Sequence, residues 1–333
     1  GFKLTDDDEA DIEAIFLREE GLRFAAPSEI GGVSDGSEYR RQYAGLLKEV
    51  IKEVEDTSYP IVIDAANGAA SAFVEPLFAG WRGGVTFMGN LPDGVNINKE
   101  VGVTHIASLA SEVVKRKASL GIAYDGDTDR VLLCDSQGRT LDGDIMLWVI
   151  GRWLAKRGAL GAGVTATVMS NMVLEDLLAA EGIKVFRCPV GDRYVLDTMK
   201  REGARIGGEQ SGHIIALEYA NTGDGLCSGI LFLKAVAELG EDISTLADRF
   251  ERYPQVLRNI KVVDKDRVMN SPSVAAAAAE AEKLLSGRGR MLLRPSGTEP
   301  LIRVFAESRD AGLMDSAADI MEAAIKKEIA NHA

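Results

Sequence analysis

Three aspartates at alternate positions, in the stretch LGIAYDGDTDRVLLCD, are the residues best placed to do chemistry: Asp125, Asp127 and Asp129. Apolar runs over 120–124 and 131–134 flank them, so the pattern predicts a strand, a short acidic loop and a returning strand. Carboxylates this close repel one another, at about 4 kcal/mol per pair for a separation of ~4 Å and an effective dielectric near 20. A hard divalent cation with oxygen ligands offsets that repulsion, and Mg²⁺ suits a few carboxylates completed by phosphate or water. We therefore predict a Mg²⁺ site here.

Other kinds of acidic loop have different sequence requirements. Acidic residues are common in turns, so the three carboxylates could simply point into solvent. An EF-hand requires Gly at the sixth loop position and Glu at the twelfth, where this chain has Arg130 and Ser136. A phosphatase nucleophile loop of the Asp-x-Asp-x-Thr kind requires Thr at the position of Asp129. A metal loop and a solvated turn are the interpretations left.

Composition bounds the class of protein. A chain of 333 residues is too long for one core and predicts two or three domains. No apolar run reaches the roughly 18 residues of a membrane span, and the formal charge of −13 argues against a nucleic-acid binder. An anionic ligand must then be bound by a few placed arginines. Cys134, Cys188 and Cys227 are far apart in apolar surroundings, which predicts buried free thiols in the cytoplasm.

The order of helical and strand patterns predicts the fold class. Short apolar strands alternate with helices twice, which indicates two successive α/β layered domains with mainly parallel sheets, over 38–140 and 141–252. Residues 253–333 have the pattern of a small α+β domain, and residues 1–37 that of an acidic helix and linker remaining from a first domain. Asp144 is expected to cap the first long helix of the second α/β domain. Ligands of parallel sheets bind beyond the carboxyl ends of strands, where the acidic loop falls.

A second polar constellation lies between two apolar strands, in GGEQSGH over 207–213. Its glycines let the backbone turn and approach a ligand closely. Glu209, Ser211 and His213 offer donors and acceptors that suit sugar hydroxyls. A polar hairpin whose histidine bonds locally explains the same residues.

A third constellation is the turn RPSGTEPLIR near the C-terminus. Its candidate anion-binding residues are Arg294, Ser296, Gly297, Thr298 and Arg303. Exposed N–H groups of such a turn form an anion-binding concavity, and arginines bind phosphate in bidentate fashion. It is not a P-loop, because no lysine follows the glycine and a strand follows where a helix should. The alternative is an ordinary hairpin with surface arginines.

Arg193, in VGDR at a strand-to-helix step, is placed for an anionic ligand near a helix start. Equally, Asp192 could be the N-cap of that helix and Arg193 a surface residue. We include Arg193 among the candidate substrate-binding residues.

Taken together, these loops resemble those of the α-D-phosphohexomutase superfamily. DGDTDR resembles its metal loop, GEQSGH its sugar-binding loop and RPSGTEPLIR its phosphate-binding loop, in the family's order and approximate spacing. The strings VGDRYVL, NTGDG and LLRPSGTEPLIRV, with Gln210 in the sugar loop, are most similar to bacterial phosphoglucosamine mutases. The resemblance runs from residue 1 to about 330. It implies domains around a central cleft, with this chain beginning at the last helix of the first.

The resemblance also implies an activity. Such isomerases interconvert glucosamine 6-phosphate and glucosamine 1-phosphate through a 1,6-bisphosphate, using an enzyme phosphoserine and Mg²⁺ held by the three aspartates. Arg130 would act beside the transferring group, the GEQSGH residues would bind sugar hydroxyls, and the C-terminal turn would bind the phosphate that is not reacting. The expected partner is a phosphosugar substrate, with no nucleic acid and no membrane, and the expected assembly a homodimer.

The chain departs from the family pattern in two places. Thr128 stands where the family usually has Gly, which bears on the loop backbone and the metal geometry. The family's phosphoserine motif, Thr-Ala-Ser-His-Asn-Pro or close to it, does not occur, so we expect no mutase turnover from these residues alone. Two alternatives stay open: a phosphomannomutase or phosphoglucomutase, and a phosphosugar-binding module without catalysis.

Overall fold

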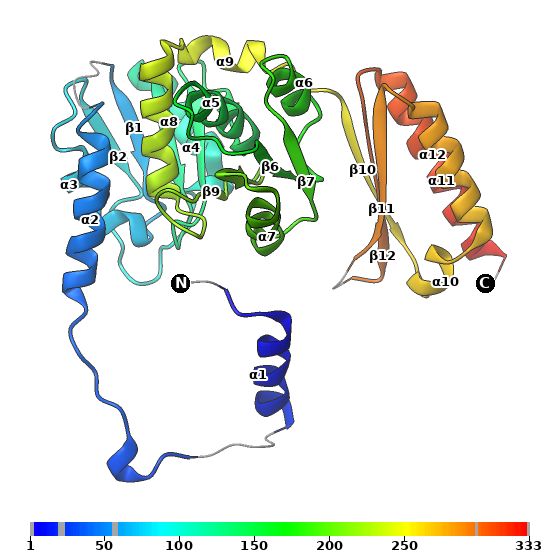
Figure 1. Cartoon of the computed structure of the whole chain (residues 1–333), viewed down its shortest axis with the longest axis horizontal. Helices are drawn as coiled ribbons and strands as arrows, with labels where there is room; N and C mark the ends of the chain where they lie inside the picture. The colour runs from blue at the N-terminus through cyan, green and yellow to red at the C-terminus, as the bar shows by residue number, and fades with distance from the viewer. Residues whose placement is uncertain (1–2, 19–23, 55–58, 297–298, 332–333) are drawn as a thin grey trace. The chain divides into compact units, whose positions relative to one another are not determined.

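The computed structural model describes residues 3–18, 24–54, 59–296 and 299–331 (Figure 1). The chain divides into a first unit of residues 1–170 and 178–249, and a second unit of residues 171–177 and 250–333. No helix in the described ranges is long and apolar enough to cross a membrane. All three cysteines are free and buried, as predicted, and burial raises the pKa of Cys134 to about 12.

The first unit contains a five-stranded sheet that carries the acidic loop. In the order β2-β1-β3-β4-β5, its strands are Val85–Met88, Ile61–Asp64, Leu120–Tyr124, Val131–Asp135 and Thr140–Leu141. The strands β2, β1 and β3 are parallel, while β4 and β5 are antiparallel additions. Every residue of β1 and β3 is buried, which matches their nearly continuous apolar sequences. The acidic loop is thus the turn of the β3–β4 hairpin.

A four-stranded sheet of the same unit repeats this plan. In the order β7-β6-β8-β9, its strands are Val185–Cys188, Val164–Thr167, Ile206–Gly208 and Ile214–Ala216. Again three strands are parallel and the last is antiparallel. The GEQSGH loop is the turn of the β8–β9 hairpin, in the place that the acidic loop takes in the first sheet. The predicted α/β layers are confirmed, with each mainly parallel sheet closed by an antiparallel hairpin.

One buried helix connects these two sheets. The helices of the first unit are α1 (Asp6–Arg18), α2 (Ser37–Ile51), α3 (Val74–Phe78), α4 (Ile106–Arg116), α5 (Gly143–Lys156), α7 (Asp192–Glu202), α8 (Gly225–Leu239) and α9 (Ile243–Arg249). The first twelve residues of α8 are buried all round, and α8 contacts α2, α5, β3, β4 and β9. A helix that is apolar on all sides belongs in a core. The ranges predicted as separate α/β domains therefore pack into one unit around α8, and the predicted boundary between them stays a prediction.

The second unit is an antiparallel sheet covered by helices. Its strands, in the order β10-β12-β11, are Gln255–Lys261, Leu301–Ser308 and Gly289–Pro295. The long helices α11 (Pro272–Leu285) and α12 (Ala311–Ala330) lie on one face (Figure 1), and α10 (Lys265–Met269) is a short turn before them. This is the predicted α+β architecture. Part of α6 (Val173–Ala179) belongs here too, because Asn171 hydrogen-bonds the backbone of Tyr253 in both directions.

The expected helix cap at Asp144 is wrong. The helix α5 begins at Gly143, and the Asp142 carboxylate accepts the N–H groups of Asp144 and Ile145. Gly143 itself donates its N–H to the carbonyl of Gln210, 3.1 Å away. That contact with the GEQSGH loop places the helix start where only a residue without Cβ fits, because a Cβ on Gly143 would lie 1.9 Å from the Glu209 carbonyl oxygen.

Asp64, the last residue of β1, organises two loops near the acidic loop. Its buried carboxylate accepts the N–H of Ala66 at 2.9 Å and the N–H of Gly102 at 2.7 Å. Both residues have positive φ, 55° and 80°, so one carboxylate holds two left-handed turns. Burial raises the pKa of Asp64, and the two backbone N–H groups only partly offset that rise.

This raised pKa predicts a pH dependence for Asp64→Asn. The unfolded chain loses the Asp64 proton at a lower pH than the folded chain, so the free energy of unfolding falls as pH rises between the two pKa values. The substituted amide does not titrate. We expect the unfolding free energy of the wild type minus that of the variant to shrink from about pH 4 to about pH 7. Urea unfolding across this range measures it, with Asp197→Asn at an exposed site as control, and a widening difference would contradict the prediction.

Candidate functional site

The three aspartates of the acidic loop converge. One carboxylate oxygen from each of Asp125, Asp127 and Asp129 lies within 4.8 Å of the other two. Adjacent ligands of an octahedral Mg²⁺ are about 3 Å apart and opposite ones about 4.2 Å apart, so these oxygens must move closer together to share one cation. Asp125 is 2% exposed, whereas Asp127 is exposed, so one side of the group is open. The group can hold a divalent cation and leave positions for another oxygen ligand.

Arg130 stabilises the negative loop from one side. Its Nε donates to Oδ2 of Asp125 at 2.7 Å and lies 3.5 Å from Asp129. Its backbone N–H also donates to Oδ1 of Asp125, so the buried carboxylate is held at both oxygens. Burial lowers the pKa of Arg130, but the charge and hydrogen bond of Asp125 and the neighbouring aspartates raise it further. The guanidinium is therefore charged, and the side chain is about two-fifths exposed, with N–H groups left for a ligand.

Backbone hydrogen bonds join the GEQSGH loop directly to the acidic hairpin. The N–H of Val131 donates to the carbonyl of Gly212 at 3.1 Å. Gly212 has φ of 91°, and a Cβ there would lie 2.0 Å from the Val131 carbonyl oxygen. The next turn, NTGDG, makes a similar contact, because the N–H of Gly225 donates to the carbonyl of Thr128 at 2.9 Å. Glycines at these positions allow the loops to meet through backbone atoms.

One pocket of about 290 Å³ lies where these loops meet. It is lined by Lys3, Asp129, Arg130, Gly191, Asp192, Glu209, Ser211 and His213. The structure thus brings together Asp129 and Arg130 of the acidic loop and the three polar residues predicted for the sugar loop. Glu209 accepts the N–H of Gly191 at 3.0 Å, which ties the VGDR turn to the same pocket.

His213 connects the two loops by its ring. Nδ1 lies 3.2 Å from Oδ2 of Asp129, and Nε2 lies 3.6 Å from Oδ2 of Asp192. The ring is 4% exposed, and Gly223 of the NTGDG turn packs against it so closely that a Cβ would lie 2.2 Å from Nε2. His213 is therefore fixed in orientation between two carboxylates.

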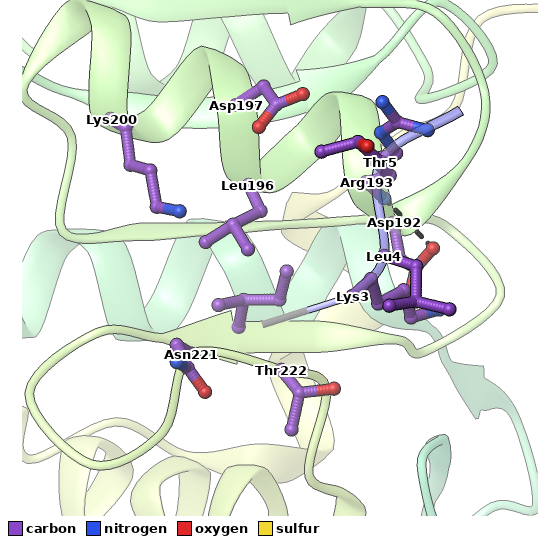
Figure 2. Close-up of a pocket in the computed structure, with 11 residues that line it drawn as sticks. Lys3, Leu4, Thr5, Asp192, Arg193, Leu196, Asp197, Lys200, Asn221 and Thr222 are labelled. Carbon is purple, nitrogen blue, oxygen red and sulfur yellow. Dashed lines mark hydrogen bonds and ion pairs between the residues drawn. The ribbon is translucent and has the colours of Figure 1, made fainter. Parts of the chain in front are cut away.

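Arg193 lies in a different place from the other predicted substrate residues of the first unit. It lines a neighbouring pocket of about 250 Å³ together with Lys3, Leu4 and Thr5 (Figure 2). Its guanidinium pairs with Asp6. It is not among the residues that line the pocket of Glu209 and His213. Its role in substrate binding stays a prediction.

In the second unit, the predicted anion-binding arginines face each other. Arg294 of β11 and Arg303 of β12 are directly paired in the antiparallel register. Like charges opposite one another are destabilising unless an anion lies between them. Arg303 makes an ion pair with Glu299 at 3.2 Å, yet its buried Nε has no hydrogen-bond partner among the described residues. Ser296 is buried next to this pair, whereas Gly297 and Thr298 lie outside the described residues.

Sequence reasoning missed three groups near these loops. Lys265 of α10 donates to the backbone carbonyls of Ser296 and Glu299, at 2.5 and 3.2 Å, which adds a cation to the C-terminal turn. Asp192 was considered only as a helix cap. Asp224 of NTGDG caps α8 at Cys227 and accepts the hydroxyl of Tyr43. No local pattern identifies these roles, because each depends on residues distant in sequence.

The departure at Thr128 has a structural consequence. Thr128 has φ of 68°, a left-handed conformation that β-branched residues rarely adopt. Its hydroxyl is buried and has no hydrogen-bond partner among the described residues. The acidic loop therefore requires the conformation that glycine adopts without strain, and threonine adopts it at a cost.

The chain matches known protein families. The family models described as "Phosphoglucomutase/phosphomannomutase, alpha/beta/alpha domain III" and "C-terminal domain" match residues 142–253 and 257–324. The chain is 43% identical over 329 residues to the phosphoglucosamine mutase of Carboxydothermus hydrogenoformans, covering 98% of this chain and 74% of that protein. It is 40% identical over 331 residues to that of Bacillus subtilis, covering 99% and 74%.

Solved structures share the fold. One is a phosphoglucomutase/phosphomannomutase family protein of Burkholderia thailandensis, with a TM-score of 0.70 and 19% identity. Another is the N-acetylphosphoglucosamine mutase of Aspergillus fumigatus, solved with GlcNAc-6P and magnesium, with a TM-score of 0.69 and 20% identity. Each alignment covers 86% of this chain but only 64% and 65% of the solved chains, so the present chain spans less than two thirds of their length.

The strain at Thr128 predicts that Thr128→Gly stabilises the protein. Removing the strain of an L-residue in the left-handed conformation raises the free energy of unfolding by roughly 1–2 kcal/mol. The added freedom of glycine in the unfolded chain lowers it by about 0.5–1 kcal/mol. We expect a net gain of up to about 1.5 kcal/mol in the free energy of unfolding, measured with urea. Thr140→Gly, the same exchange in strand β5, is the control and should destabilise. A loss of stability at Thr128→Gly would show that the strain is not there.

Proposed function

Since the chain belongs to the phosphoglucosamine mutase family, within the α-D-phosphohexomutase superfamily, we propose that the pocket around Glu209 and His213 binds glucosamine 6-phosphate and glucosamine 1-phosphate for their interconversion. The observation that supports this most directly is the single pocket shared by Asp129, Arg130, Glu209, Ser211 and His213. Residues predicted from two separate motifs meet there through backbone hydrogen bonds.

The acidic loop is proposed to hold Mg²⁺ through Asp125, Asp127 and Asp129. Bound there, the cation would neutralise phosphate charge, which is the main demand of phosphoryl transfer. Arg130 is the catalytic residue of the proposal. Because its guanidinium is anchored on Asp125 and still about two-fifths exposed, it can direct N–H groups at a transferring phosphoryl group without reorganising.

The sugar loop is proposed to bind hydroxyl groups. Glu209 accepts, while Ser211 and His213 can donate or accept, so the three match a ring with several hydroxyls. The 1,6-bisphosphate must be bound in two orientations for the phosphate to move between carbons. Contacts that both orientations share are what such a loop needs. The backbone hydrogen bond between this loop and β4 keeps these groups fixed while the ligand changes its orientation.

The C-terminal turn is proposed to bind the phosphate that is not reacting. Arg294 and Arg303 supply two guanidinium groups from opposite strands, and Ser296, Gly297 and Thr298 supply hydroxyl and backbone donors. Lys265 adds an ammonium that bonds the carbonyls of Ser296 and Glu299. A phosphate between the paired arginines would remove their repulsion, which explains why this sequence tolerates them in direct register.

A mutase for neutral hexose phosphates is the second candidate, because the matching family models describe phosphoglucomutases and phosphomannomutases. Measured affinities for glucosamine and glucose phosphates distinguish the two. We further propose that the protein works in the cytoplasm, where its three buried thiols stay reduced.

We expect the 333-residue chain by itself to give no detectable conversion of glucosamine 6-phosphate to glucosamine 1-phosphate. The phosphoserine motif does not occur in its sequence, so the phosphoryl donor is missing from the reaction mixture. Phosphorus NMR of the chain with substrate and Mg²⁺ measures this directly. Conversion at a rate above that of a heat-inactivated sample would contradict the prediction, because it would show phosphoryl transfer without that donor.

Arg303→Ala tests the phosphate turn. Charge-assisted hydrogen bonds contribute about 1.5–3 kcal/mol, so we expect glucosamine 6-phosphate to bind about 10- to 150-fold more weakly by calorimetry. Arg288→Ala, at the opposite end of the same hairpin, is the matched control and should leave the affinity unchanged. Equal affinity of wild type and Arg303→Ala would remove Arg303 from the site.

A further inference from the structure

Asp192 brings to the pocket a carboxylate that the proposed mechanism does not use. It is the first residue of α7, and its Oδ1 accepts the N–H of Arg193 at 2.8 Å. Its Oδ2 lies 3.6 Å from Nε2 of His213 and lines the pocket with Glu209 and Ser211. Asp129 in the same pocket belongs to the proposed metal site. Asp192 therefore offers this pocket a negative charge that is not assigned to a metal.

The buried ring of His213 lies beside that carboxylate. Its Nδ1 lies 3.2 Å from Oδ2 of Asp129, and its Nε2 is the ring atom nearer to Asp192. Nε2 is buried and has no hydrogen-bond partner among the described residues. Contact with Gly223 holds the ring in place. The pocket thus has a fixed, buried ring beside Oδ2 of Asp192.

The carboxylate of Asp192 matches an ammonium group better than a hydroxyl. An ammonium carries three N–H donors and a positive charge, so it adds a charge–charge attraction to its hydrogen bond with the carboxylate. A hydroxyl donates one hydrogen bond and carries no charge.

A primary ammonium already contacts this carboxylate in the structure. Nζ of Lys3 forms an ion pair with Oδ2 of Asp192, and Figure 2 shows Lys3 next to Asp192 at the start of α7. Burial raises the pKa of Asp192, but the hydrogen bond from Lys3 is among the interactions that bring it below its usual value. The position accepts an ammonium group and stabilises the ionised carboxylate.

We propose that Oδ2 of Asp192 forms the subsite for the 2-ammonium group of an amino-sugar phosphate, and that Asp192 makes the pocket select this sugar over a neutral hexose phosphate. The inference rests on the proposed function and deepens it, because it names the residue that reads the amino group. Asp192 acts here as a specificity-determining residue that touches the substrate.

Calorimetry on the full chain in Mg²⁺ tests this with two pairs of ligands that differ only at carbon 2: glucosamine and glucose 6-phosphates, and the corresponding 1-phosphates. Both isomers are needed because the sugar binds in two orientations and the ammonium meets Asp192 in one of them. We expect the wild type to bind at least one glucosamine phosphate tenfold or more tightly than its glucose counterpart. Asp192→Asn should abolish this preference and change glucose phosphate binding less than about threefold.

The matched control is Asp197→Asn, the same exchange at an exposed position of α7 outside this pocket, which should keep the preference. Three results would overturn the inference: a wild type without preference, an Asp192→Asn variant that retains it, or a variant that loses both kinds of sugar equally. Failure of the wild type to bind any of the four phosphates is a separate outcome, since it overturns the proposed function together with the subsite.

Discussion

The site depends on a set of short backbone contacts between hairpins that are far apart in sequence. The N–H of Val131 bonds to Gly212, the N–H of Gly225 to Thr128, and the N–H of Gly143 to Gln210. In each of these bonds glycine stands where a Cβ would collide with a backbone carbonyl. Because the loops meet through main-chain atoms, the aspartates of one hairpin and the polar residues of the other keep fixed positions. Such rigid support is what a site needs to hold its groups within a fraction of an ångström.

Charge balance follows from this geometry. The chain carries a net charge of −13, and the acidic loop adds to the excess locally. Within the first unit, Arg130 compensates Asp125, and His213 lies between Asp129 and Asp192. In the second unit the imbalance has the opposite sign, because two arginines face each other with Lys265 nearby. Each loop therefore has an excess of charge that is opposite to the charge of its proposed ligand. The ligand is a cation or an amino sugar in the first unit and a phosphate in the second.

Strain is concentrated around the same loops. Among the described residues, the non-glycine positions with positive φ are Ala66, Asn67, Asn98, Glu100, Lys117 and Thr128. Apart from Lys117, which ends a helix, these lie in the acidic loop or in the turns beside it: the N–H of Ala69 bonds to Gly126, and the N–H of Asn98 bonds to Ala66. Left-handed conformations are costly and persist where surrounding structure enforces them. The buried carboxylate of Asp64 supplies part of that enforcement, which links the stability of β1 to the shape of the metal loop.

Local sequence determined the elements and the identity of the loops. Apolar runs, glycines and caps act over a few residues, so the strands around Asp125, the strands around Glu209 and the C-terminal hairpin of Arg294 and Arg303 could be placed, and the motifs indicated their chemistry. Tertiary structure alone decided which of these residues meet. The contact of His213 with Asp192, the position of Lys265 at the phosphate turn, the start of α5 at Gly143 and the burial of α8 between two sheets all arise from residues far apart in the chain. Periodicity and spacing describe one segment at a time, so they do not give the distances between segments. The packing of hairpins and helices against each other sets those distances and thereby forms the site.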